Sequence, residues 1–110
     1  MLRKANRLTT KQFDEFFAAG RRFHSSVCTI VYTSHPTFHG AVVVGKKVHK
    51  RAVVRNTLRR RIYSQLYRQV GRSGQTGVFI LLTKPSASTL PRKELQHFIE
   101  SAIATVLKKA

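Results

Sequence analysis

The chain has 110 residues, of which 21 are lysine or arginine and only 4 are aspartate or glutamate, giving a formal net charge of +17. This length leaves no room for two hydrophobic cores, and a hydrophobic content of 42% argues against a disordered body. Because a compact chain of this charge repels itself, we expect its partner to be a polyanion, with nucleic acid ahead of an anionic membrane surface.

The cysteine count and the apolar runs bear on the cellular compartment. A single cysteine, Cys28, excludes an internal disulfide and fits a reducing compartment. No apolar run approaches the roughly 20 residues that span a bilayer. The N-terminus is basic but lacks the apolar core of a signal peptide. We therefore expect a cytoplasmic protein without a membrane role.

The first predicted element is a short helix from about Thr10 to Ala19, which follows a basic arm over residues 1–8. Thr9 and Gln12 have the spacing of a capping box, in which each side chain bonds the other residue's backbone N–H. Gly20 is a natural end for the helix. The three phenylalanines of this segment share its apolar side.

Strands are predicted next. Residues 25–34 are rich in β-branched and aromatic side chains, as strands are, and alternation places Tyr32 and Val31 on opposite faces. A second strand is predicted from Ala41, paired with the first as a hairpin. Residues 21–24 would add a short edge strand.

The second half of the chain predicts helix, strand and helix. A long helix is expected from about Arg51 to Val70, a buried strand over residues 78–83, and a final helix after Pro91. A helix between two strands implies that the flanking strands pair in parallel. The chain is therefore predicted to be a single α/β domain, 1–110, an α+β two-layer sandwich with a small mixed sheet of about four strands and three helices.

The long helix carries the most informative pattern. Six arginines fall between Arg51 and Arg68, with no carboxylate among them. At 100° per residue, one face is apolar and the next arc carries Arg55, Asn56, Arg59, Arg60 and Tyr63. Arg61 and Arg68 fall on the outer, solvent side. Guanidinium groups bind phosphate bidentately, and arginine and tyrosine can stack on unpaired bases, so this face favours RNA.

Other functions have weaker support. The adjacent Asp14 and Glu15 point apart on a helix, and Glu94 and Glu100 do not share a helical face. One cysteine without ligand pairs at zinc-finger spacing gives no metal site. We expect no catalytic or metal-binding residue. The main alternative is a purely structural RNA-binding protein, such as a small ribosomal protein, and a nuclease using paired histidines is a third.

The segment KKVHKRAVVRNTLRRR, residues 46–61, resembles the signature of the bacterial ribonuclease P protein subunit. The segment NRLTTKQFDEFFAAG also resembles the family's opening, and VYT, VGKK and LLTKP follow in the family's order. Thr57, Arg61 and Tyr63 depart from the residues usual at their positions. The resemblance extends over nearly the whole chain.

The resemblance implies a ribonucleoprotein that removes the 5′ leader of precursor tRNA. The RNA subunit would perform the hydrolysis with Mg²⁺, and the protein would bind the catalytic RNA and the precursor tRNA, with no obligatory protein partner. The family fold has an unusual left-handed βαβ crossover, which is therefore expected here too.

The resemblance also assigns site residues. Contacts with the catalytic RNA would come from Lys46, Lys47, Lys50, Arg51, Arg55, Asn56, Arg59 and Arg60. The leader would lie in a cleft between the first helix and the sheet, with contacts from Lys4, Asn6, Arg7, Phe13, Phe17 and Tyr32. Core packing explains Phe13 and Phe17 equally well.

Overall fold

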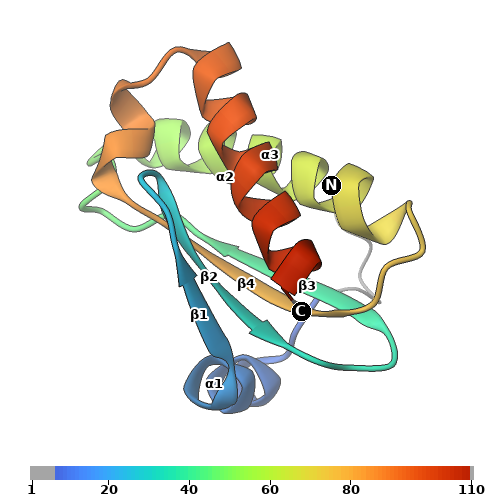
Figure 1. The fold of residues 1–110 in the computed structure, drawn as a ribbon. Coiled ribbons are helices and arrows are strands. Elements are labelled where there is room, and N and C mark those ends of the chain that lie inside the picture. The colour runs from blue at the N-terminus through green and yellow to red at the C-terminus, as the bar shows by residue number, and fades with distance from the viewer. Residues whose placement is uncertain (1–6, 110) are drawn as a thin grey trace.

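A computed structural model describes residues 7–109 as a four-stranded sheet with helices on both faces (Figure 1). The strands are β1 (Arg21–His24), β2 (Cys28–Thr33), β3 (Phe38–Val43) and β4 (Gly77–Thr83). The α-helices are α1 (Thr10–Ala19), α2 (Ala52–Leu66) and α3 (Arg92–Lys109). A π-helical turn over Tyr67–Gly71 continues α2, and a 3₁₀ helix over Pro85–Thr89 precedes α3.

The helix α1 begins and ends as its sequence predicts. The Gln12 backbone N–H donates to the Thr9 hydroxyl at 3.2 Å, and the Thr9 backbone N–H donates to the Gln12 side chain at 3.0 Å. At the other end, the Gly20 N–H donates to the carbonyl of Phe16 at 2.9 Å. A side chain at Gly20 would collide with Val31, 2.4 Å from the position of a Cβ atom. Glycine thus lets the end of α1 approach the sheet.

The strand order is β1-β2-β4-β3, with β1–β2 and β2–β4 antiparallel and β3–β4 parallel. The parallel pairing across α2 and the β1 edge strand are confirmed. The expected hairpin between β2 and β3 is wrong, because β4 lies between them. Residues 77–81 of β4 are all buried, and a strand that is apolar on both faces is best covered at the centre of the sheet. The hand of the β3–α2–β4 crossover stays a prediction.

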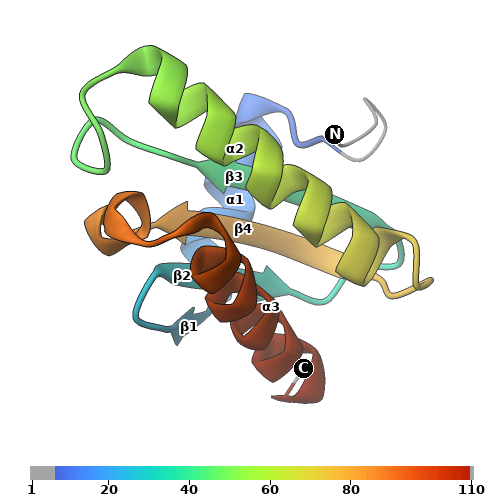
Figure 2. The same cartoon turned by 90° about the horizontal axis from the view of Figure 1, so that it is seen from above.

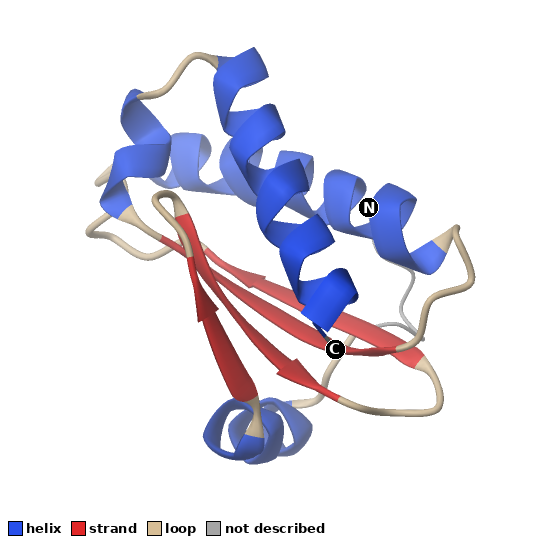
Figure 3. Cartoon of the chain, in the orientation of Figure 1, coloured by secondary structure: helices blue, strands red, loops and turns tan. Residues whose placement is uncertain are grey.

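The two faces of the sheet are covered unequally (Figures 1 and 3). The face under α2 and α3 holds the main core, in which Phe79, Leu81, Ile62 and Ile99 are almost fully inaccessible to solvent. The opposite face has a smaller buried cluster against which α1 packs. Helix α1 therefore adds a partial third layer to the expected sandwich.

Candidate nucleic-acid interface

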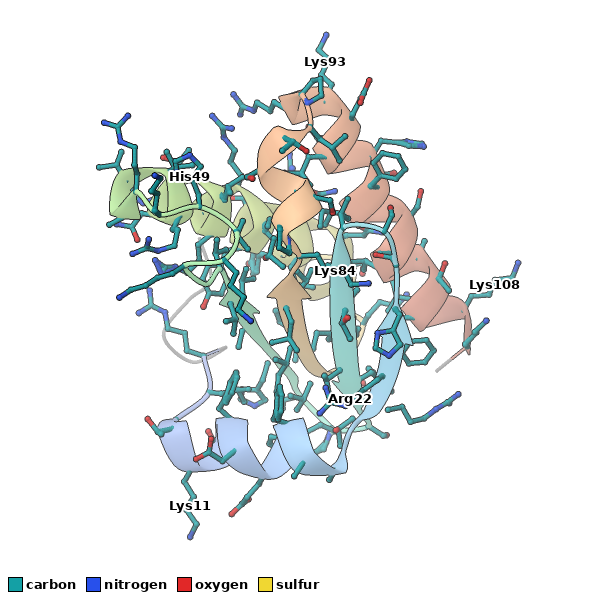
Figure 4. All side chains as sticks on the ribbon, turned by 90° about the vertical axis from the view of Figure 1, so that its left-hand side faces the viewer. Lys11, Arg22, His49, Lys84, Lys93 and Lys108 are labelled. Carbon is teal, nitrogen blue, oxygen red and sulfur yellow. The ribbon has the colours of Figure 1, made fainter. Side chains whose placement is uncertain are left out.

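The start of α2 is positively charged and lacks a side-chain cap. The preceding residue, Arg51, is extended and makes no capping hydrogen bond with its side chain. Arg55, one turn into the helix, donates through Nη1 to the carbonyls of His49 at 3.0 Å and Lys50 at 2.8 Å. Figure 4 shows His49 on the loop just before α2. Arg55 therefore holds this loop against the helix, in addition to any role in binding phosphate.

Further along the same side of α2, Arg59 donates through Nη2 to the Oδ1 atom of Asn56. Asn56 and Arg60 are exposed, and Arg59 is half-buried. The amide thus orients one guanidinium group while leaving its remaining donors to solvent. The structure brings these predicted RNA-binding residues together on one side of α2, as the helical spacing indicates.

The loop between β3 and α2 carries three exposed lysines on a fixed backbone. Val44 and Val48 are buried and anchor the loop to the core. The Val48 N–H donates to the Gly45 carbonyl at 3.0 Å and closes a turn between them. The lysines at positions 46, 47 and 50 remain exposed.

The face of the sheet that carries α1 is only partly covered by that helix. Val31, Val78 and Ile80 are buried beneath α1 and its phenylalanines. Two residues further along the strands, Thr29 pairs with Leu82, and Leu82 pairs with Val43. These three residues form the floor of a groove of about 360 Å³, which we term the sheet groove.

The walls of the sheet groove are cationic. Lys46 and Lys47 line it from the loop before α2, and Lys84 lines it from the end of β4. Lys84 also donates to the carbonyl of Ser25 at 2.5 Å, which holds its ammonium group at the edge of the groove. A largely apolar floor between lysine walls can contact bases while the ammonium groups bind phosphates.

The predicted leader-binding residues are only partly brought together. Phe13 and Phe17 stack with ring centroids 5.7 Å apart, and both are half-buried against the sheet. The guanidinium carbon of Arg22 lies 4.5 Å from the centroid of the Phe17 ring, between the sheet and α1 in Figure 4. The contacts of Phe13, Phe17 and Arg22 therefore anchor α1 to the sheet. Arg7 is exposed just before α1, whereas Lys4 and Asn6 lie outside the described residues.

The expectation that Tyr32 shares a cleft with the phenylalanines of α1 is wrong. Tyr32 packs on the opposite face of the sheet, with its ring 5.1 Å from that of Phe79 in the main core. The alternation along β2 already separated Tyr32 from Val31, which lies under α1.

Two side chains on the sheet have shifted pKa values. Burial raises the pKa of the Cys28 thiol, and the Ser25 hydrogen bond and the charge of Lys84 offset this only in part. Burial also lowers the pKa of His39, with a smaller contribution from the neighbouring His35. Both groups are therefore held toward their neutral forms.

Comparison with known proteins identifies the family. The family model described as Ribonuclease P matches residues 2–107. The chain belongs to this family. A solved RNase P protein from Staphylococcus aureus is 17% identical, with a TM-score of 0.82, covering 94% of this chain and 96% of that one. The RNase P protein of Thermotoga maritima is 15% identical, with a TM-score of 0.72, covering 94% of this chain and 96% of that one. A search of curated protein sequences found no match.

As a ribonuclease P protein, the chain is a subunit of an endoribonuclease that processes tRNA, in which RNA performs the catalysis, and it associates with the RNase P RNA. The structural likeness shows that the fold is shared. Among residues 7–109, no helix is long and apolar enough to cross a membrane, and no group of three or more potential ligand side chains could hold a metal ion.

Sequence reasoning missed part of the RNase P protein surface. Lys84, Thr29 and Val43 line the sheet groove, yet none was predicted as a site residue. The only sequence signal was the LLTKP segment, in which Lys84 directly follows a buried strand. The groove itself depends on the pairing of β2 and β3 with β4, which local sequence does not encode.

Proposed function

We propose that this RNase P protein holds two RNAs on one continuous surface. The catalytic RNA would bind the side of α2 that carries Arg55, Asn56, Arg59 and Arg60, and the 5′ leader of precursor tRNA would lie in the sheet groove. The observation that carries the proposal is the loop from Gly45 to Lys50. Lys46 and Lys47 of this loop line the groove, and the loop backbone is held by Arg55 at the start of α2.

The physical role of this surface is to reduce repulsion between two polyanions. Four carboxylates cannot neutralise 21 cationic side chains, so most of the positive charge is available to phosphate groups. The Mg²⁺ required for hydrolysis would belong to the RNA and its substrate, and no protein side chain is given a catalytic step. Affinity should fall steeply with salt, with a log–log slope of roughly −0.7 to −0.9 per phosphate neutralised.

Two double variants test the binding of the leader and of the catalytic RNA separately. Lys46→Gln/Lys47→Gln removes charge from the groove, and Arg59→Gln/Arg60→Gln removes charge from α2 while leaving Arg55 to hold the loop. Lys108→Gln/Lys109→Gln is the matched control, because it removes the same charge at the exposed end of α3.

Two quantities should be measured at low Mg²⁺: the affinity of the protein for the RNase P RNA, and the advantage of precursor tRNA over leaderless tRNA in binding to the holoenzyme. We expect the groove variant to lose the leader advantage by about tenfold and the α2 variant to lose RNA-subunit affinity by at least that factor. An undiminished leader advantage in the groove variant would contradict leader binding there, while site-specific cleavage by the holoenzyme would still support the subunit role.

A further inference from the structure

A second cationic surface lies on the side of α2 that faces α3. Arg61 projects from α2 and Arg68 from the π-helical turn that continues it, and Arg92 begins α3 across from them. The three side chains line a groove of about 240 Å³ between the two helices, which we term the α2–α3 groove. Figure 2 shows α2 and α3 next to each other above the sheet. Residues that the helical spacing placed in open solvent therefore border a defined concave site.

The floor of the α2–α3 groove is formed by buried side chains. Ile62 and Leu95 are only 1% and 6% exposed. Between them Gln65, 7% exposed, donates through Nε2 to the backbone carbonyl of Gln96 at 2.5 Å and ties the two helices together. An anion seated on such a floor interacts more strongly with the surrounding guanidinium groups than it would in open water.

The charges around the groove favour an anion at one end. No carboxylate lines the part bordered by Arg61, Arg68 and Arg92. The positive end of the α3 dipole lies at Arg92 and adds to their field. Glu100 lines the adjoining stretch of the interhelical surface together with Arg68. An anion should therefore occupy the end near Arg61 and Arg92, away from Glu100.

We propose that the α2–α3 groove binds a phosphodiester of the RNase P RNA, at a site separate from the side of α2 that carries Arg59. An α-helix with its side chains is about 10–12 Å across, so cationic groups on its two sides can hold two stretches of RNA backbone at once. The inference depends on association with the RNase P RNA and is independent of leader binding in the sheet groove. In the simpler alternative, the arginine stems only cover the apolar floor.

The test is the salt dependence of binding of full-length protein to the RNase P RNA. The variant Arg61→Gln/Arg68→Gln/Arg92→Gln keeps long polar side chains over the floor but removes three charges. The control Arg72→Gln/Lys108→Gln/Lys109→Gln removes the same charge from exposed positions outside the groove. Because one phosphate contact is lost, the log–log slope should become shallower by about 0.7–0.9. Affinity at moderate salt should fall at least about tenfold relative to the control.

A third variant separates charge from geometry. Arg61→Lys/Arg68→Lys/Arg92→Lys keeps the charge but loses the planar fork, so it should restore the salt slope and only part of the affinity. If the glutamine variant matches the control in both slope and affinity, the groove does not bind phosphate. A lower melting temperature with an unchanged salt slope would show that the arginines serve packing alone, and would equally overturn the proposal. Normal leader discrimination by the glutamine variant would show that the sheet groove is unaffected.

Discussion

The two faces of the sheet differ in how completely they are covered. On one face, α2 and α3 bury almost every apolar side chain, including Phe79, Ile62 and Ile99. On the other, α1 has no fully buried residue and covers only part of the sheet, leaving Val43 38% exposed on the floor of the sheet groove. The first face supplies most of the stability of the fold, and the second keeps a surface free for a ligand.

This difference shows how a small domain can separate stability from binding. A chain of 110 residues has a limited core, so covering both faces completely would leave little concave surface. Cationic side chains line a groove on each face, at the loop before α2 on the open face and between α2 and α3 on the covered face. The main core contains no charged residue among those the structure describes.

Among the substitutions considered, the largest loss of stability is expected on the sheet face that α2 and α3 cover. Phe79→Ala removes a ring that is fully buried against Tyr32 and Phe38, so it should lower the free energy of unfolding by about 3–5 kcal/mol. Val43→Ala, on the open face, should cost less than about 1 kcal/mol because the side chain is already partly in water. Urea denaturation measures both. Equal losses would mean that the two faces contribute alike.

A smaller effect is expected at Gly77, where β4 begins. Its φ of +125° favours glycine, and a Cβ atom would lie 2.6 Å from the Tyr32 ring. Gly77→Ala should therefore destabilise the fold by about 1–3 kcal/mol. Gly45→Ala is the matched control, because a Cβ atom there meets no atom within 4 Å. It should be neutral or stabilising by less than about 1 kcal/mol. If Gly77→Ala leaves the free energy of unfolding unchanged, the Tyr32 ring can move aside at little energetic cost.

A substitution in the capping box of α1 tests whether this helix can unfold separately from the rest of the domain. Thr9→Ala removes the hydroxyl that caps the helix and should cost about 1 kcal/mol, while Thr10→Ala, one residue along, should change little. Hydrogen exchange should accelerate in the amides of α1 and stay unchanged in α2 and α3. Faster exchange throughout the chain would show instead that α1 opens only when the whole domain unfolds.

The smallest effect is a pH dependence from His39 on the open face. Because burial and His35 lower its pKa below 6.5, the unfolded chain binds a proton more readily than the folded one. This contribution to stability is complete above pH 6.5 and is lost as the pH falls from there through the folded-state pKa. A His39→Gln variant should show a weaker loss of stability on acidification, measured by urea denaturation between pH 7.5 and 5. If the two proteins lose stability equally on acidification, His39 does not contribute to the pH dependence of stability.

The sequence alone determined the order of the elements and the class of partner, although the strand expected from Ala41 begins at Phe38. The capping box at Thr9 and the stop at Gly20 placed α1 correctly, because both act through contacts within a few residues. Parallel pairing of β3 and β4 followed from the helix between them, and the motif over residues 46–61 indicated the family that the comparison confirmed. Charge alone favoured a polyanionic partner, since it is a sum over the chain and needs no coordinates.

Only the tertiary structure decided which residues meet. The hairpin failed because β4, which is distant in the chain, pairs with β2 and β3 from between them, and a local turn carries no information about such a strand. The same non-local packing put Tyr32 on the face opposite α1 and brought Lys84 beside Lys46. It also placed Arg92 across a groove from Arg61, although 31 residues separate them in sequence. Grooves are formed between elements, so their linings depend on how distant segments share the core.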